Sequence, residues 1–110
     1  MSKYQRTKGH NFERFLAGMF QIIDPTALRN LEYQEGGGRD IKTKLPLCVQ
    51  AKCGKQISKI LVGLKEAQGS AVIGEYSICV MRLDRDNDYV LMTFNDWFDL
   101  FQSWWELTNK

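Results

Sequence analysis

The segment Tyr76–Leu83 places the strongest constraint on what this chain can fold into. Apolar residues occupy both of its alternating faces, with Ile78 and Val80 on one face and Cys79 and Met81 on the other. A strand of this kind is buried on both sides, so it belongs at the centre of a sheet covered by two layers. A chain of 110 residues has room for one such domain, so we expect a single domain over the whole chain.

Segments with helical periodicity can supply the two covering layers. Apolar side chains recur at helical spacing from Lys8 to Ile23 and from Ile57 to Ala71, and Asn95 is the predicted N-cap of a third, aromatic helix. Short runs between turn residues indicate strands. The predicted fold is therefore α/β, a mixed β-sheet flanked by helices in the order α-β-β-β-α-β-β-α. The predicted strands cover residues 30–34, 39–44, 47–53, 76–83 and 89–94.

Composition excludes several classes of protein. With 44% hydrophobic and 12% aromatic residues the chain is expected to fold. Its longest uncharged stretch, Phe15 to Ile23, is too short to cross a bilayer, and no apolar run follows Met1 to Tyr4 as in a signal peptide. Three cysteines without a CxxC pair and one histidine argue against disulfides and structural zinc. We expect a soluble, cytoplasmic protein without a membrane segment.

The net charge of +2 is too small to indicate nucleic-acid binding by itself, but the basic residues are unevenly distributed. In the first 23 residues Glu13 is the only acidic residue, and from Arg39 to Lys65 Asp40 is the only one. Positive charge therefore gathers in the two segments that also contain the candidate site. The basic residues of these segments that are candidates for DNA phosphate contacts are Lys3, Arg6, Lys8, Arg14, Arg39, Lys42, Lys44, Lys55 and Lys59.

The candidate chemistry lies in Asp40 and in the segment Gln50-Ala51-Lys52. Alternate residues of a strand point to the same side, so Gln50 and Lys52 share one face and an otherwise apolar strand carries an amide beside an ammonium group. If Asp40 starts the neighbouring strand, its carboxylate reaches the same end of the sheet. Such oxygen ligands suit Mg²⁺, which with a lysine can activate water and offset charge on a phosphodiester. The alternative interpretation is that Gln50 and Lys52 form the polar face of an edge strand that is exposed to water.

Two further polar residues lie close to predicted apolar faces. Glu13 borders the buried side of the first helix, where it could join the site or remain an exposed carboxylate. Gln68 falls near the centre of the apolar face predicted for the second helix, where an unpaired amide is costly. Gln68 is therefore expected either to support the site residues from behind or to pair with the backbone.

Motifs in the first half of the chain resemble a known family. The residues are Lys8, Gly9, Glu13 and Arg14, which reproduce a Lys-Gly-x-x-x-Glu-Arg signature, followed by Asp40-Ile41 and Val49-Gln50-Ala51-Lys52. This pattern resembles the PD-(D/E)XK nuclease superfamily and, within it, the small archaeal-type Holliday junction resolvases. The small size of the chain would suit a virus-encoded member.

The resemblance implies a restriction-endonuclease-like fold and a homodimer that cuts opposed strands of a four-way DNA junction. It implies Mg²⁺ as cofactor, with Mn²⁺ as a possible substitute. It also implies that Glu13, Asp40 and Gln50 form the metal site and that Lys52 completes the catalytic set. The last helix, with its wide aromatic face, is then either a core element or the dimer interface.

Two departures from the family pattern keep alternatives open. Gln50 stands where a Glu is usual, so it offers a carbonyl oxygen but no charge, either as the natural residue or as a deliberate Glu→Gln replacement. The loop before Asp40 lacks the Ser that the family often carries. The alternatives are a PD-(D/E)XK nuclease that acts on other DNA structures and a catalytically impaired module that binds junctions.

Overall fold

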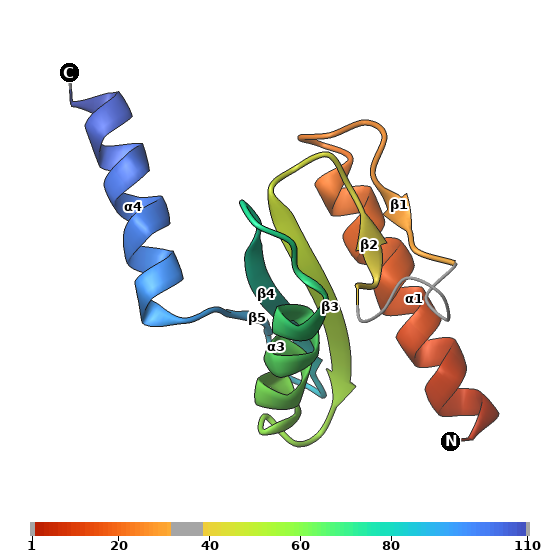
Figure 1. Ribbon diagram of the computed structural model, residues 1–110. Coiled ribbons are helices and arrows are strands. Elements are labelled where there is room, and N and C mark those ends of the chain that lie inside the picture. The colour runs from red at the N-terminus through yellow and green to blue at the C-terminus, as the bar shows by residue number, and fades with distance from the viewer. Residues whose placement is uncertain (1, 32–38, 110) are drawn as a thin grey trace.

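Three helices and five strands alternate along residues 2–31 and 39–109, which are the residues that this computed structural model describes (Figure 1). The mixed α/β class predicted from the sequence is confirmed. In chain order the elements are α1 (Lys3–Phe20), β1 (Leu28–Arg29), β2 (Ile41–Lys42), β3 (Leu47–Gly54), α3 (Lys59–Ser70), β4 (Tyr76–Leu83), β5 (Asp88–Leu91) and α4 (Phe94–Thr108).

β4 is the central strand of a three-stranded sheet, as its two apolar faces predict. It pairs in parallel with β3, where Gln50 lies opposite Cys79, and antiparallel with β5, where Val80 lies opposite Val90. α3 makes the crossover between the two parallel strands. The described strands do not form one continuous sheet, because β1 and β2 make a separate antiparallel pair.

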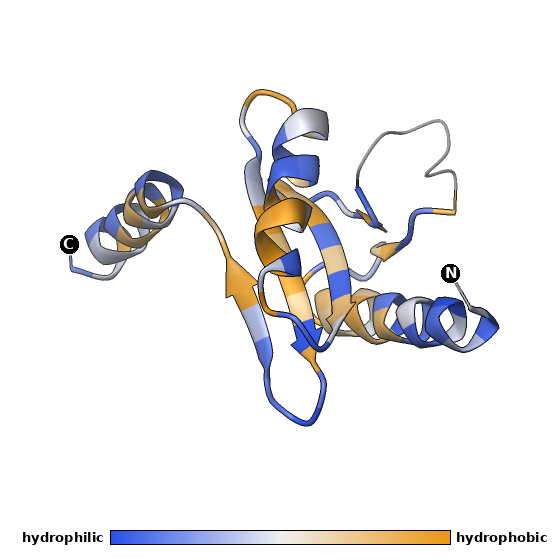
Figure 2. Cartoon of the chain, turned by 90° about the horizontal axis from the view of Figure 1, so that it is seen from below, coloured by the Kyte–Doolittle hydropathy of each residue, from blue (hydrophilic) through white to orange (hydrophobic). Residues whose placement is uncertain are grey.

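α1 and α3 cover opposite faces of this sheet (Figure 2). On the α1 face, Phe12 and Leu16 pack with Ile78 and Val80 in the hydrophobic core. On the other face α3 buries the small residues Gly63 and Ala67 together with Leu64. The alternation along β4 therefore produces the two layers that the sequence requires.

Several predicted boundaries are wrong by a few residues. α1 begins at Lys3, because the Ser2 side chain accepts a hydrogen bond from the Gln5 backbone in a capping box, and it ends at Phe20. The N-cap of α4 is Thr93, whose hydroxyl accepts from the Asp96 backbone. The first predicted strand, 30–34, is replaced by the shorter β1, and residues 32–34 lie outside the described residues.

Asp24 joins the loop after α1 to the turn between β2 and β3. Its carboxylate accepts hydrogen bonds from the Thr26 hydroxyl at 2.6 Å, the Thr43 hydroxyl at 2.7 Å and the Lys44 backbone at 2.8 Å. These hydrogen bonds hold the pKa of the buried Asp24 carboxyl well below its usual range. The contact fixes β2 relative to α1 and so helps to place Asp40, which precedes β2.

α4 extends away from the rest of the fold (Figure 1). None of its residues is buried, so the expectations that this helix flanks the sheet or packs into the core are wrong. It contacts the rest of the fold through a hydrogen bond that the Tyr76 hydroxyl, at the start of β4, donates to the Asp99 carboxylate. The cause is local: α1 and α3 already occupy the two faces of the sheet, and only Met92 and Thr93 separate β5 from α4.

No helix among the described residues combines the length and the apolar character needed to cross a membrane.

Candidate active site

Asp40 is fixed to the free edge of β3 at two points on either side of Gln50. Its backbone N–H donates to the Val49 carbonyl oxygen at 2.8 Å, and its carboxylate Oδ2 accepts from the Ala51 backbone N–H, also at 2.8 Å. The other edge of β3 pairs with β4, so these groups would lack strand partners without Asp40. The start of β2 therefore places the Asp40 carboxylate beside the Gln50–Lys52 segment.

Gln50 and Lys52 share the α3 face of β3, as strand alternation predicts, while Val49 and Ala51 face the α1 core. Gln50 is 4% exposed, and no hydrogen bond to its side-chain amide occurs among the described residues. Because no fully buried polar side-chain atom of the described residues lacks a partner, the Gln50 amide retains contact with solvent. The amide oxygen is thus free of protein hydrogen bonds among the described residues and could accept a ligand.

Lys52 forms an ion pair with Glu66 of α3, in which the Nζ–Oε1 distance is 2.8 Å. The sequence pattern did not single out Glu66. It also predicted that Gln68 lies on the buried face of α3, and this is wrong because Gln68 is exposed. The helix buries its small residues Gly63 and Ala67 together with Leu64, and the i, i+4 spacing of the two small residues was the available signal.

Burial raises the pKa of the Asp40 carboxyl to about 6. The Ala51 N–H and the Lys52 ammonium oppose this effect, whereas the neighbouring carboxylates of Glu13 and Glu66 add to it. The carboxylates of Asp40, Glu13 and Glu66 and the ammonium group of Lys52 are therefore close enough to influence one another's charge at the edge of β3. The same environment raises the pKa of the Cys79 thiol to about 12, mainly through burial, so this cysteine is an inert neighbour beneath the site.

Glu13 of α1 lies close enough to Asp40 to affect its pKa, but its carboxylate is paired with Arg29. Its Oε1 atom lies 3.3 Å from both Nε and Nη2 of Arg29 on β1, and both side chains are largely buried. Arg29 thereby neutralises one of the carboxylates near Asp40. The structure places Glu13 at the margin of the site, where its charge reaches Asp40 while its oxygen binds Arg29.

The donor set around Asp40 fits a magnesium ion that keeps much of its water. Among residues 2–31 and 39–109 no group of three His, Cys, Asp or Glu side chains is placed to hold a metal. Mg²⁺ needs less than this, since it is often bound by one or two carboxylates together with waters and substrate phosphates. Asp40 and the amide oxygen of Gln50 could provide two such ligands. The Glu35 carboxylate, which by sequence could compensate for the missing charge at Gln50, lies outside the described residues.

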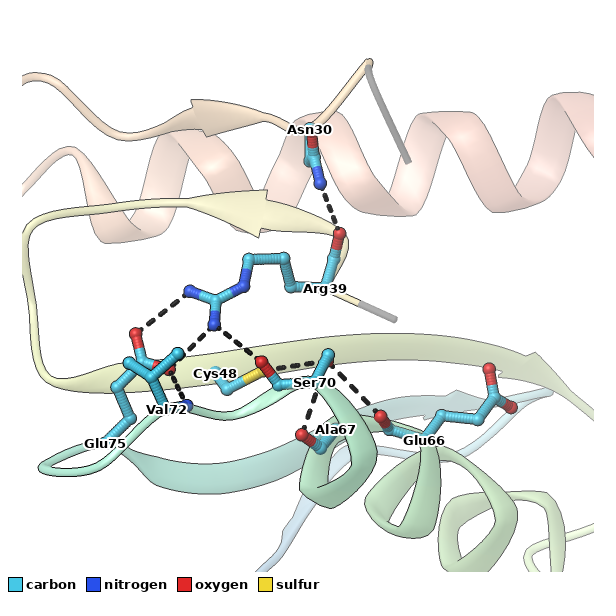
Figure 3. A network of polar contacts seen from close by, with 8 residues as sticks. All are labelled: Asn30, Arg39, Cys48, Glu66, Ala67, Ser70, Val72 and Glu75. Carbon is cyan, nitrogen blue, oxygen red and sulfur yellow. Dashed lines mark hydrogen bonds and ion pairs between the residues drawn. The ribbon is translucent and has the colours of Figure 1, made fainter. Parts of the chain in front are cut away.

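Arg39, a candidate for DNA contact, is held within the fold (Figure 3). Its guanidinium donates to both carboxylate oxygens of Glu75, at 2.9 and 2.7 Å, and to the Ser70 carbonyl oxygen at 3.0 Å. This fork ties the segment before Asp40 to the end of α3 and the start of β4. The hydrogen bond to Glu75 raises the pKa of Arg39 and lowers that of Glu75, so both groups stay charged.

A cleft of about 790 Å³ lies beyond the end of β3. Lys8 forms an ion pair with Asp84 there, and Tyr4, Lys55 and Arg85 complete the lining. The charges of Lys8 and Asp84 act on Cys53 of β3, which packs against the core on the α1 side, so the cleft lies near the end of β3 on that side. Tyr4 and Arg85 were not among the residues selected from the sequence.

The remaining basic candidates lie on the surface. Unlike Arg39 and Lys8, which are partly buried and paired with carboxylates, none of them is buried or intermediate in exposure. These exposed residues are Lys3, Arg6 and Arg14 on α1, Lys42 and Lys44 around β2, and Lys55 and Lys59 after β3.

Comparisons with family models, with curated proteins and with solved structures found no match for this chain.

Proposed function

We propose that this chain is a magnesium-dependent endonuclease that cuts four-way DNA junctions. The observation that supports this most directly is the attachment of the Asp40 carboxylate to β3 beside Gln50 and Lys52. A carboxylate, an amide oxygen and an ammonium group at one sheet edge are the groups that phosphodiester hydrolysis needs.

Each side chain has a role that its surroundings allow. Asp40 in its charged form and the carbonyl oxygen of Gln50 would hold Mg²⁺, or Mn²⁺ in its place. When bound, the ion lowers the pKa of an attacking water and offsets charge on the phosphate. Lys52 donates hydrogen bonds to a phosphate oxygen, and Glu66 limits the directions in which its ammonium group can point.

The distribution of charge supports a DNA substrate. Exposed lysines and arginines lie on α1 and on the segment after β3, and the cleft beyond the end of β3 carries Lys8, Lys55 and Arg85 against Asp84. Side chains of this kind bind phosphates without reading the base sequence. A homodimer would present two such sites, which matches the approximate two-fold symmetry of a four-way junction.

The test is cleavage of a labelled four-way junction and of a linear duplex with the same sequence, in Mg²⁺, by the wild-type chain and by Gln50→Glu and Asp40→Asn. We expect selective cleavage of the junction by the wild type, no cleavage by Asp40→Asn, and unchanged binding by all three. Equal cleavage of both substrates would instead indicate a nuclease with another DNA target. Cleavage by Asp40→Asn would remove Asp40 from the site.

One observation favours a second candidate, a junction-binding module without catalytic activity. The site lacks the charge of the usual Glu at Gln50, and Arg29 neutralises Glu13. This candidate predicts binding that weakens steeply with salt and no cleavage in Mg²⁺ by the wild-type chain. Cleavage by Gln50→Glu alone would favour it.

A further inference from the structure

α4 presents an apolar surface that no described residue of the chain covers. Its apolar residues lie on one half of the helix, and six of them are aromatic. Their exposed fractions run from 44% at Phe101 to 69% at Phe94, and the three Trp residues are about half exposed. Thr93 caps this helix, which is therefore a formed element with an unused face.

The size of this surface is that of a protein interface. A buried aromatic side chain covers about 150–250 Å², so six of them at about half exposure present on the order of 600 Å². This estimate is at the upper end for the largest patch on a monomer, roughly 300–600 Å². It approaches the ~800 Å² that each partner contributes to a standard interface, and Leu100 and Leu107 add to it.

The polar half of α4 argues against DNA and anionic membranes as its partner. It contains Asp96, Asp99 and Glu106 and no basic residue. Because the whole chain has a net charge of +2, the residues outside α4 carry a net charge of +5. An acidic helix is repelled by phosphates, whereas membrane-surface helices carry Lys and Arg on their polar face. The body of this same chain has the complementary charge.

The body also has an apolar surface suited to a helix. α1 covers the β3 side of the sheet, and its flank next to β4 exposes Phe15 by 43% and Met19 by 50%. Arg82 of β4 lies 4.5 Å from the Phe15 ring centroid, so this flank faces the β4–β5 side. Across the strand pair, Val90 of β5 is 61% exposed beside the buried Val80.

The helix cannot reach this surface on its own chain. Met92 packs against the hydrophobic core and Thr93 caps α4, so no free residue remains between β5 and the helix. In both views α4 points away from α1, on the opposite side of the sheet (Figures 1 and 2). A second copy of the chain is not restricted in this way.

We propose that α4 packs its apolar face against the Phe15, Met19 and Val90 surface of a second copy, in a two-fold dimer in which each chain gives and receives one helix. This dimer does not rest on the nuclease proposal. It uses surfaces away from Asp40 and would persist in a protein without catalytic activity.

The experiment measures the mass of the full chain by light scattering and its tryptophan emission during dilution. All three Trp residues lie in α4, so the emission reports on this helix alone. We expect a dimer whose emission moves to longer wavelength as it dissociates. Trp104→Glu and Met19→Glu should each raise the dissociation constant at least 100-fold. Val62→Glu, at an exposed site on α3, should leave it unchanged.

Circular dichroism of each variant confirms that the fold is retained. A wild-type chain that stays monomeric at 100 μM would overturn the proposal, as would a dimer that Trp104→Glu does not weaken. If Trp104→Glu gives monomers and Met19→Glu does not, α4 packs elsewhere and the acceptor surface is wrong. Binding of a monomeric wild type to neutral phosphatidylcholine vesicles would assign α4 to a membrane surface instead.

Discussion

The carboxylate of Asp40 accepts a hydrogen bond from the backbone N–H of Ala51 at 2.8 Å. This contact places an acidic side chain against a sheet edge that is largely closed to water. The single hydrogen bond does not offset the cost of burial, because the pKa of Asp40 rises to about 6 from an ordinary value of 3.8. The site therefore holds its carboxylate at a cost in stability.

The first prediction follows from this cost. The folded chain holds the Asp40 proton more tightly than the unfolded chain does, so the contribution of this group to stability is greatest below about pH 4 and is lost as the pH rises through about 6. Asp40→Asn keeps an oxygen for Ala51 without the charge. We expect it to raise the free energy of unfolding at pH 7 by about 1–3 kcal/mol and to abolish metal-dependent cleavage.

Urea unfolding of both proteins from pH 4 to pH 8 provides the measurement, and the difference between the two isolates Asp40 from other titrating groups. The difference should be small at pH 4 and should grow through pH 6. A variant that is less stable than the wild type at pH 7 would contradict the prediction.

The second prediction concerns the ion pair of Lys52 and Glu66. Glu66 is partly exposed, and an ion pair of this kind contributes about 0–1 kcal/mol, so Glu66→Gln should unfold nearly as the wild type does. We expect Lys52→Met to lower the single-turnover cleavage rate at least 100-fold and Glu66→Gln to lower it about tenfold or less, because the lysine is retained but less well oriented. Equal losses in both variants would mean that Glu66 itself contacts the reacting groups.

The third prediction separates two roles for Arg39. Its planar guanidinium binds Glu75 at two points and Ser70 at a third, a geometry that lysine cannot reproduce. We expect Arg39→Lys to lower the free energy of unfolding by about 1–2 kcal/mol while junction binding changes less than about twofold, because the charge is kept. Binding that falls tenfold with unchanged stability would show that Arg39 contacts the DNA.

The alternation of residues within single segments predicted the central strand and the face on which the site residues lie. The two apolar faces of Tyr76–Leu83 gave the central strand with its observed bounds, and alternation along β3 put Gln50 and Lys52 on one face. The rotation of α3 was not predictable in this way. It depends on how closely Gly63 approaches β4, which periodicity of large apolar residues does not record, and it decides that Glu66 rather than Gln68 lies near the site.

The unpacked α4 was missed for a related reason. Its aromatic face has the periodicity of a core helix, and sequence alone does not reveal whether the covering surface belongs to the same chain. The fork between Arg39 and Glu75 joins residues 36 positions apart, a distance that no local motif spans.

The fourth prediction tests the close approach of α3 with two glycines of the same helix. A Cβ atom at Gly63 would overlap the Cys79 Sγ atom and lie 3.0 Å from the Lys52 Cγ atom, whereas a Cβ atom at Gly69 would have no neighbour within 4 Å. We expect Gly63→Ala to shift α3 or the Cys79 side chain, at a cost of about 1–3 kcal/mol, and to displace Lys52. Gly69→Ala should instead stabilise the chain by up to about 1 kcal/mol, because alanine is the better helix former.

Thermal and urea unfolding of the two variants provide the comparison, with Cys79→Ala as a third change that removes the obstructing sulfur. Gly63→Ala combined with Cys79→Ala should lose less stability than the two single changes predict when added, since the alanine at position 63 then has room. Cleavage should fall in Gly63→Ala and stay at the wild-type rate in Gly69→Ala, because Lys52 is displaced only in the first. If both glycine variants behave alike, the packing of Gly63 against Cys79 does not position the lysine.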